Sequence, residues 1–337
     1  MAAMIEVEKL TKWYGRTLAL DEATFRVEMG QIVGFLGPNG AGKSTTLRIL
    51  TGYLPATSGQ ARVGGHSCLM ESLAVRSLVG YMPENVPLYP EMRVEEYLTF
   101  RAGLKGVTGG KRRAAVDRVI ERCWLKEVRR RLVGQLSKGY RQRVGLAEAI
   151  IADPKVLILD EPTIGLDPTQ IGETRRLIKS LGESHTILLS SHILPEVEKT
   201  CSHLVIIASG RIAAAGSVEE LRTGLAQKTK VVLELKAGPK SGPVPGKTSD
   251  GPAEMARVLG QQSGAAQVDR EDAGDGWTRF IVTPSGSGDP REALAALVVQ
   301  RGWQLRELRR QAPTIEELYV QVTAGEAAVA AAGKSAA

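Results

Sequence analysis

The sequence has few cysteines and no long apolar run. Cys68, Cys123 and Cys201 are odd in number and widely spaced, so they form neither a metal-binding pattern nor a disulfide framework. No apolar stretch approaches the roughly 18 residues that a membrane span needs. The first residues, Met1–Glu6, lack a basic stretch followed by an apolar one, so no secretory signal is expected. These absences together favour a cytoplasmic chain that does not itself cross a membrane.

The positive charge of the chain is concentrated in one segment. The 337 residues carry a net charge of +7, and residues 101–131 alone hold 11 Lys and Arg against 3 Asp and Glu. Such a segment either faces an anionic surface, such as the inner leaflet of a membrane or RNA, or forms an ordinary solvated helix face. The segment alone does not decide between these two interpretations.

Apolar runs alternate with helical stretches along the first two thirds of the chain. Residues 32–36, 156–159, 186–189 and 204–207 have the continuous apolar character of buried parallel strands. Residues 5–10 alternate between apolar and polar side chains like an edge strand. Strands that alternate with helices predict an α/β fold, with helices on the faces of the sheet.

The composition changes near residue 225, and a length of 337 residues also favours two domains. The elements expected after that point follow the order β-α-β-β-α-β, which is the ferredoxin-like arrangement. They are predicted at 231–236, 253–263, 266–270, 277–282, 290–301 and 304–310. A last helix is expected from Thr314, with Glu317 completing a capping box. The expected division is an α/β domain at 4–224, a small α+β domain at 225–323 and a disordered tail at 324–337.

Residues 37–45 fit the phosphate-binding P-loop pattern G-x-x-x-x-G-K-[ST]. An apolar strand precedes them and a helix follows, so backbone N–H groups and the positive end of a helix would form an anion site. Lys43 would reach the β- and γ-phosphates of a nucleotide, and the Ser44 hydroxyl would ligate Mg²⁺. The candidate binding residues are Gly37, Pro38, Asn39, Gly40, Ala41, Gly42, Lys43, Ser44 and Thr45. The alternative is a glycine-rich turn that matches the pattern by chance.

Two carboxylates, Asp160 and Glu161, end the apolar run at 156–159. The carboxyl ends of strands are where ligands bind in open α/β folds. Asp160 would hold Mg²⁺ directly or through water. Glu161 would be the general base that polarises the attacking water. The alternative is a strand that happens to end in acidic residues.

Residues 136–142 read Leu-Ser-Lys-Gly-Tyr-Arg-Gln, and at this point the chain resembles the ABC-type ATPases, whose signature is LSGGQ. The resemblance covers residues 4–224 and implies a P-loop NTPase domain with a helical subdomain at about 86–150. It also implies a homodimer in which two ATP molecules are sandwiched head to tail. The signature residues that would bind the partner's nucleotide are Ser137, Lys138, Gly139 and Tyr140.

Other positions of the family pattern are present in order. The resemblance implies that Tyr14 stacks on adenine, that Asp167 belongs to the loop linking the two nucleotide sites, and that His192 contacts the γ-phosphate. Glu84 stands where the family usually has Gln; it can accept a hydrogen bond or approach Mg²⁺ through water. Lys138 and Tyr140 replace the usual Gly and Gln, and Lys138 keeps positive charge near a phosphate.

The departures at the signature and Glu84, together with residues 87–90, resemble a subfamily that contains gliding-motility and nitrous-oxide-reductase-maturation ATPases, and residues 313–319 resemble the end of ABC-2 ATPases with a C-terminal extension. That subfamily works with separate membrane subunits of the ABC-2 export type. The expected place is the inner face of the cell membrane, with the basic helical subdomain toward the membrane subunit or the inner leaflet.

Two other functions compete with that of an exporter. A soluble ABC protein of ribosomes or DNA usually has two cassettes or a long coiled-coil insertion, but Lys43 and Ser137 are only 94 positions apart. No nucleic-acid partner is therefore expected. A regulatory role for the domain at 225–323 is the third possibility; that domain shows no catalytic cluster.

Overall fold

The structure is a computed structural model that describes residues 3–226, 230–238, 251–263, 265–285, 289–311, 314–317 and 319–320. The chain divides into two compact units, one containing Met1–Val218 and the other Glu219–Val320. The tail predicted at 324–337 lies outside the described residues.

The first unit is built on a six-stranded sheet whose strand order is β10-β9-β3-β8-β7-β6. Its strands are β3 (Ile32–Leu36), β6 (Val79–Met82), β7 (Val156–Leu159), β8 (Thr186–Ser191), β9 (His203–Ala208) and β10 (Arg211–Ser217). All neighbours are parallel except β9 and β10. Because β8 pairs with both β3 and β7, the carboxyl ends of these three strands meet at one edge of the sheet. That edge is where the predicted site residues follow their strands.

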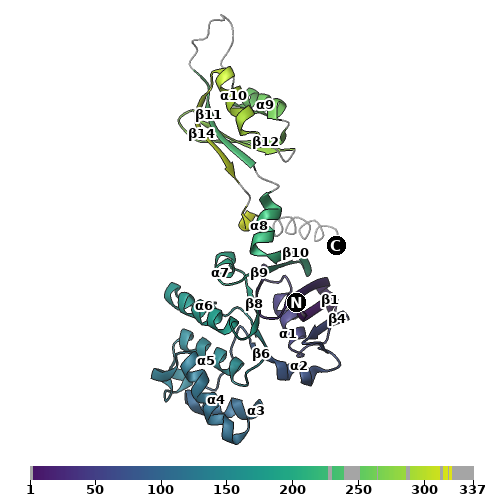
Figure 1. The fold of residues 1–337 in the computed structure, drawn as a ribbon, viewed down its shortest axis with the longest axis vertical. Helices are drawn as coiled ribbons and strands as arrows, with labels where there is room; N and C mark the ends of the chain where they lie inside the picture. The colour runs from purple at the N-terminus through teal and green to yellow at the C-terminus, as the bar shows by residue number, and fades with distance from the viewer. Residues whose placement is uncertain are drawn as a thin grey trace, which may run out of the picture. The chain divides into compact units, whose positions relative to one another are not determined.

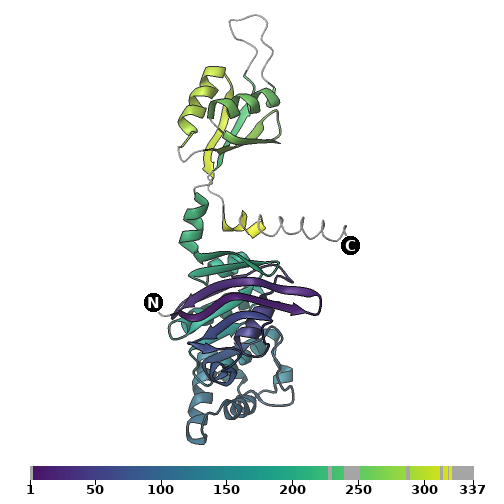
Figure 2. The ribbon, with the colours of Figure 1, turned by 90° about the vertical axis from the view of Figure 1, so that its right-hand side faces the viewer.

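A second, antiparallel sheet has the order β2-β1-β4-β5. Its strands are β1 (Ala3–Tyr14), β2 (Thr17–Glu28), β4 (Ser58–Val63) and β5 (His66–Ser67). The purple β1 and β2 form its long, curved ribbon in Figure 2. The prediction of an edge strand at 5–10 was wrong, because β1 pairs with β2 on one side and with β4 on the other. The strand β4 itself was not predicted.

Helix α1 (Lys43–Leu50) joins the two sheets into one core. Its Leu47, Ile49 and Leu50 belong to a buried cluster that also contains Leu10 of β1 and Leu188 of β8. Burial of apolar surface on both sides of α1 therefore fixes the helix that follows the P-loop relative to both sheets. The remaining helices beside the six-stranded sheet are α2 (Ser72–Leu78), α6 (Pro168–Gly182) and α7 (Leu194–Glu198).

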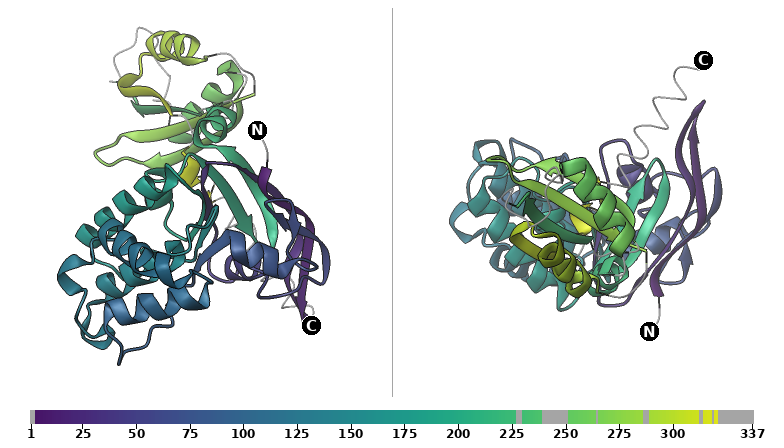
Figure 3. Two further views of the ribbon diagram at one scale, coloured as in Figure 1. Left: turned by 60° about the horizontal axis from the view of Figure 1, so that its bottom comes forward. Right: turned by 90° about the horizontal axis from the view of Figure 1, so that it is seen from above.

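A group of helices fills the predicted helical subdomain. It contains α3 (Val94–Leu104), α4 (Gly109–Arg122), α5 (Lys138–Ile150) and the short 3-10 turns Lys126–Val128 and Val133–Gln135. In Figure 3 (left) these blue helices gather on the side of the unit away from the purple β1. Helix α4 is amphipathic and buries Ala115, Val116, Val119 and Ile120.

Most of the basic side chains at 101–131 bond within the protein. Seven of the eleven donate a hydrogen bond or form an ion pair: Arg101, Lys105, Arg112, Arg118, Arg122, Lys126 and Arg129. Lys111, Arg113, Arg130 and Arg131 are exposed, and the described part of the chain offers their side chains no such partner. Fewer of the basic side chains in this segment are therefore available to a partner than the sequence suggested.

The second unit begins with α8 (Val218–Ala226) and continues with the predicted β-α-β-β-α-β order (Figure 1). Its elements are β11 (Lys230–Lys236), α9 (Pro252–Ser263), β12 (Ala265–Asp272), β13 (Thr278–Pro284), α10 (Arg291–Arg301) and β14 (Gln304–Gln311). The sheet is antiparallel in the order β12-β13-β11-β14. Helices α9 and α10 cover one face, where Leu259 and Leu297 pack with Leu233 and Phe280.

The helix predicted from Thr314 begins there, and Glu317 N–H donates to Thr314 Oγ1 at 3.1 Å. Among the residues with described positions, no helix combines the length and the apolar character that crossing a membrane requires.

Candidate functional site

The loop between β3 and α1 folds tightly because glycines occupy its close contacts. Gly40 and Gly42 have φ of 84° and 105°, in a region that side-chain-bearing residues rarely adopt. A Cβ on Gly42 would lie 2.6 Å from the carbonyl oxygen of Ala19 on β2. A Cβ on Gly37 would lie 2.4 Å from the carbonyl oxygen of Ile207 on β9. The loop is therefore held against both sheets by its own backbone.

Lys43 is the first residue of α1 and is almost fully buried. Its Nζ donates to the carbonyl oxygens of Gly37 at 2.7 Å and of Pro38 at 3.2 Å, so the ammonium lies inside the loop. The first turn of α1 contains no acidic residue. The positive end of this helix is thus free of any carboxylate of its own and can attract an anion.

Asp160 and Glu161 leave β7 at the same edge of the sheet, and Ser190 of β8 holds both. The Ser190 hydroxyl donates to Asp160 Oδ1 at 2.6 Å and accepts the Glu161 N–H at 2.9 Å. All three residues are buried. Ser190 was not among the predicted site residues; its position at the carboxyl end of an apolar strand was the available signal. It fixes the direction in which the two carboxylates leave the strand.

The carboxylate of Glu161 contacts two other predicted site residues. His192 Nδ1 lies 2.9 Å from Oε2, so Nδ1 must carry the proton in this hydrogen bond. Lys43 Nζ lies 3.5 Å from Oε1, close enough for an ion pair but without a hydrogen bond. Oε1 is therefore a buried oxygen with unused acceptor capacity, which is rare in folded proteins and indicates room for a polar group.

Glu161 also has an unusual backbone conformation, with φ of 48°. A non-glycine residue at positive φ costs roughly 1–3 kcal/mol, and such residues cluster at functional sites. Here the conformation is secured by the bond from the Glu161 N–H to Ser190. This backbone conformation lowers the stability of the fold, so its retention at Glu161 indicates that the direction of the carboxylate matters for catalysis.

These residues line one open pocket of about 460 Å³. The predicted residues on its wall are Pro38, Asn39, Gly40, Gly42, Lys43, Ser44, Thr45, Glu84, Glu161 and His192. Ala19 and Ile164 also line it and were not predicted. Gly37, Ala41 and Asp160 are not on the wall; Gly37 packs against Ile207, and Ala41 and Asp160 are buried. A loop rich in backbone N–H groups, a buried ammonium and a carboxylate with a free oxygen suit a phosphorylated substrate and its hydrolysis.

The signature residues lie at the start of α5 and do not line this pocket. Ser137 caps the helix, and its Oγ accepts the Tyr140 N–H at 3.4 Å. A Cβ on Gly139 would lie 2.7 Å from Gln170 Oε1, so the signature packs closely on the start of α6. Lys138 Nζ lies against Gly165 in the turn before α6.

Asp167 and Tyr14 also lie outside the pocket wall. Asp167 caps α6, and its Oδ1 accepts the Gln170 N–H at 2.9 Å. Tyr14 is half-exposed at the end of β1, with Lys12 Nζ 5.3 Å from the centre of its ring. The predicted residues therefore fall into two groups, one around the P-loop pocket and one at the adjoining starts of α5 and α6, with Tyr14 apart from both.

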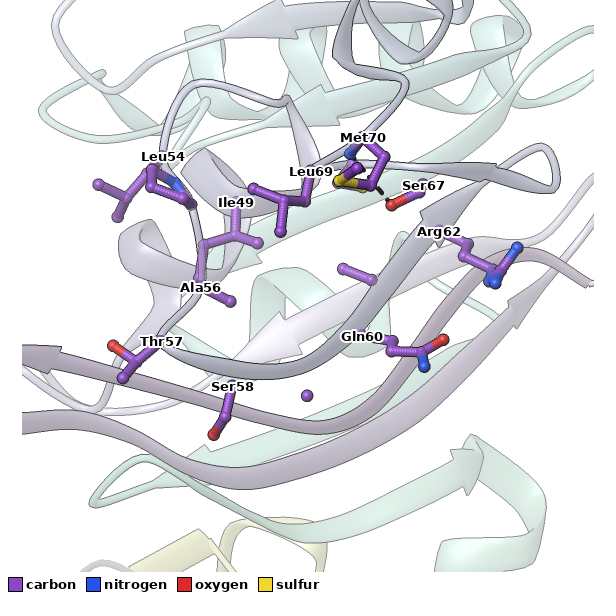
Figure 4. Close-up of a pocket in the computed structure, with 14 residues that line it drawn as sticks. Ile49, Leu54, Ala56, Thr57, Ser58, Gln60, Arg62, Ser67, Leu69 and Met70 are labelled. Atoms are coloured by element: carbon purple, nitrogen blue, oxygen red, sulfur yellow. Dashed lines mark hydrogen bonds between the residues drawn. The ribbon is translucent and has the colours of Figure 1, made fainter.

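A second hollow of about 360 Å³ lies between the end of α1 and strands β4 and β5. Figure 4 shows Leu54, Ala56 and Leu69 toward one side of it and Gln60 and Arg62 toward the other. No carboxylate or histidine is on its wall. It therefore lacks an acid–base pair, and the chemistry belongs to the P-loop pocket.

The comparisons with known proteins agree with this geometry. A family model described as ABC transporter matches residues 20–164. The chain is 40% identical over 214 residues to the bacitracin transport ATP-binding protein BcrA of Bacillus licheniformis, covering 63% of this chain and 69% of that protein.

A second relative matches nearly the whole chain. The daunorubicin resistance ATP-binding protein DrrA3 of Streptomyces coeruleorubidus is 32% identical over 329 residues, which is 95% of each protein. The solved structure of an ATP-binding subunit of an ABC transporter is 30% identical, with a TM-score of 0.60 over 66% of this chain and 92% of that one.

Proposed function

This chain belongs to the ATP-binding proteins of ABC transporters, and we propose that it drives an exporter whose membrane-spanning subunits are separate chains. Members of this family bind and hydrolyse ATP, and this chain is an ATPase of that kind. The names of two relatives refer to bacitracin transport and daunorubicin resistance. Those names favour export over import as the direction.

One observation carries the proposal of a dimer. The P-loop group lines its own pocket, whereas Ser137, Lys138, Gly139, Tyr140 and Asp167 do not. The first turn of α5 holds no acidic residue, so its positive end can attract an anion, but it does not line the anion pocket of its own chain. A second copy placed head to tail would bring that helix start to the nucleotide held by the first. Each complete site would then use residues of two chains.

Within such a site the P-loop residues would bind and orient ATP. Phosphate oxygens would take the hydrogen bonds that Lys43 Nζ now donates to Gly37 and Pro38. Glu161 would accept the proton of the attacking water through Oε1, the buried oxygen that has no hydrogen bond. His192 would keep the carboxylate turned toward that water through Oε2 and contact the γ-phosphate.

The residues present fit a magnesium ion. The described residues include no cluster of three His, Cys, Asp or Glu side chains that could cage a metal. Mg²⁺ usually takes only one or two protein ligands and relies on substrate phosphates and water for the rest. The Ser44 hydroxyl on the pocket wall supplies a hard oxygen donor of that kind, with Glu84 on the same wall as a further candidate, and the buried Asp160 carboxylate, which does not line the pocket, would act through water. Bound Mg²⁺ would neutralise charge on the β- and γ-phosphates.

We assign the contact with the membrane subunit to the helical subdomain. Tyr89, Phe100 and Leu104 are 42%, 42% and 63% exposed. Phe100 and Leu104 are one turn apart on α3, and the Tyr89 and Phe100 rings meet edge to face at 5.9 Å. The exposed, unpaired Lys111 and Arg113 extend the same subdomain with positive charge.

An exposed apolar group and exposed basic side chains in one subdomain suit a protein of mixed apolar and acidic surface beside the inner leaflet. We therefore propose an ABC-2-type membrane subunit as the partner and the cytoplasmic face of the cell membrane as the location. The second unit, which has its own packed core, would add dimer contacts.

The test uses Glu161→Gln as a trap. The tagged variant would be expressed in its native host, the membranes solubilised with ATP and Mg²⁺, and co-purified proteins identified by mass spectrometry. The proposal predicts a polytopic membrane protein in near-equal amount. The control is Glu161→Gln combined with Lys43→Ala, which should lose that protein because nucleotide no longer binds. Ribosomal or DNA-bound partners without any membrane protein would contradict the proposal.

A further inference from the structure

Glu148 is a buried carboxylate that lies in the last turn of α5 and does not line the nucleotide pocket. Every described side chain that bonds to it comes from α3. The Tyr97 hydroxyl donates to Oε2, and Arg101 donates to Oε1 from Nε at 2.7 Å and from its Nη2. Lys105 Nζ donates to the backbone carbonyl of Glu148 at 2.8 Å. We name these four residues the Glu148 junction.

The spacing of the junction makes it specific for one register of the two helices. Tyr97 and Arg101 of α3 and Lys105, which caps the end of that helix, follow one another at four-residue spacing, so they lie in one row. Sliding α3 past α5 by a fraction of a turn would take these donors away from a buried carboxylate, which is strongly unfavourable. Burial, together with the nearby carboxylate, raises the pKa of the Tyr97 phenol, so the hydroxyl remains a donor at physiological pH.

A buried ion pair is weak evidence for stability, because apolar side chains of similar volume often stabilise a fold as well or better. Such pairs are better explained where they specify one arrangement of two elements. Apolar residues could have joined α3 to α5 here. Helix α4 of the same subdomain is buried in that way, through side chains such as Val116 and Val119. The charged junction therefore points to a requirement for a fixed helix position.

A third element meets the junction, the segment between β6 and α3 that includes Glu84. The Tyr89 ring packs edge to face on Tyr97 at 6.0 Å, and the Tyr97 hydroxyl lies 3.5 Å from the Pro87 carbonyl oxygen. Val86 packs on α5 where Gly145 leaves space, since a Cβ there would lie 2.9 Å from both Val86 methyl groups. This segment starts at Glu84 on the wall of the nucleotide pocket.

The junction thus connects the pocket to the other end of α5. Glu148 and Ser137 are separated by three turns of a continuous helix, or about 16 Å. A helix transmits a displacement at one end to the other because its backbone hydrogen bonds make it stiff. A change around Glu84 would reach Ser137 through Val86 and Tyr97, without any contact between Ser137 and the chain's own pocket.

We propose that the Glu148 junction is a positioning device that sets the signature helix of one subunit according to the occupancy of that subunit's own nucleotide pocket. It rests on the proposed role of Ser137–Tyr140 in binding the partner's nucleotide. Tyr97 and Glu148 are positioning residues and touch no substrate. Their loss would leave nucleotide binding to the P-loop intact and weaken the closure of the dimer.

The test compares two equilibria in full-length chains that carry Glu161→Gln. The first is binding of a fluorescent ATP analogue at a protein concentration at which the chain is monomeric. The second is the ATP concentration at half-dimerisation, measured by sedimentation velocity. Glu148→Gln and Tyr97→Phe, added separately, should each raise the ATP concentration at half-dimerisation roughly fivefold to tenfold, which is within the usual range of coupling between sites. The Kd for the fluorescent ATP analogue should stay within about twofold of that of the Glu161→Gln chain.

The matched control is Glu95→Gln, which breaks the ion pair of α3 with Arg129 and leaves the contact with α5 unchanged. It should leave both values within about twofold. Unchanged dimerisation in folded Glu148→Gln and Tyr97→Phe chains would overturn the inference, as would an equal shift in Glu95→Gln. If Glu148→Gln does not fold, the conservative Tyr97→Phe decides the outcome alone.

Failure of the proposed function would look different. If the Glu161→Gln chain itself stays monomeric with saturating ATP and Mg²⁺, the dimer proposal is wrong, and this inference falls with it. If that chain dimerises while the junction variants dimerise equally well, only the inference is wrong.

Discussion

His192 Nδ1 lies 2.9 Å from Glu161 Oε2, and this hydrogen bond joins the ends of the neighbouring strands β8 and β7. One oxygen of Glu161 is thus fixed by a protein donor, while the other is buried 3.5 Å from Lys43 Nζ and accepts no hydrogen bond. This combination suits a general base, because one oxygen fixes the orientation of the carboxylate and the other can accept the proton. The pair is the structural basis for the hydrolysis that we assign to the P-loop pocket.

Because the two residues act as a unit, their variants should not be additive. Glu161→Gln should lower kcat by roughly 100-fold or more, the usual contribution of general base catalysis, and retain ATP binding. His192→Ala should lower kcat by a similar order. The double variant should lose little more than Glu161→Gln alone. Steady-state hydrolysis by the three proteins checks this, and losses that multiply would show that His192 acts independently of Glu161.

Lys43→Ala should remove most of the nucleotide affinity. The buried ammonium is held inside the loop by Gly37 and Pro38, and charge-assisted hydrogen bonds to phosphate are among the strong ones. We expect the Kd for ATP to rise by at least tenfold in a calorimetric titration. Lys111→Ala, which removes an exposed cation on α4 that does not line the nucleotide pocket, serves as a control for loss of one positive charge. An unchanged Kd in Lys43→Ala would contradict the role of the loop.

Ser190→Ala should affect both stability and turnover. The variant leaves the buried Glu161 N–H without its acceptor, which costs about 1–3 kcal/mol in the free energy of unfolding. It also frees Asp160 and Glu161 to turn, so kcat should fall about tenfold or more. Denaturant unfolding and ATPase assays test the two effects. The control is Ser180→Ala on α6, whose hydroxyl bonds only to a carbonyl of its own helix.

The three cysteines should be unreactive in the folded protein. Burial raises the pKa of the Cys68 and Cys123 thiols to about 12 and also raises that of Cys201. Since the thiolate is the reactive form, alkylation at pH 8 should be slower than in the unfolded chain by about three orders of magnitude. Mass spectrometry after timed iodoacetamide treatment, with and without denaturant, measures this. Rapid native labelling at neutral pH would contradict the burial.

The raised pKa values of the buried thiols also predict how the stability of the fold changes with pH. The folded thiols keep their protons up to about pH 12, whereas unfolded thiols lose theirs near pH 8.5. The contribution of the buried thiols to the free energy of unfolding is therefore complete below about pH 8.5 and is lost as the pH rises toward 12. Unfolding by urea at pH 7, 9 and 10 should show a falling midpoint.

The sequence predicted the elements whose signals are local. The P-loop pattern at 37–45, the apolar strands that end at Asp160 and His192, and the β-α-β-β-α-β order of the second unit all depend on neighbouring residues. The strand β4 was missed because Ser58–Val63 contains Gly, Gln and Arg and buries only Ala61 and Val63. Without β4, the strand β1 was expected at an edge.

Long-range polar contacts could not be predicted. Glu148 was predicted only as part of a helix, and its partners Tyr97 and Arg101 are 51 and 47 residues away in the sequence. Ser190 gave no motif signal, because its role depends on the pairing of β7 with β8. The basic segment at 101–131 suggested a free charged surface, but its side chains mostly satisfy carbonyls and carboxylates of the same unit.

The central claim is that a complete nucleotide site needs two chains, and one measurement tests it most directly. Sedimentation velocity of Glu161→Gln, with and without ATP and Mg²⁺, should show a monomer becoming a dimer with two bound nucleotides. Adding Ser137→Arg at the start of α5 should return the protein to monomer while each chain still binds ATP. A Glu161→Gln chain that binds ATP and remains monomeric, or a dimer that Ser137→Arg does not disturb, would contradict the account.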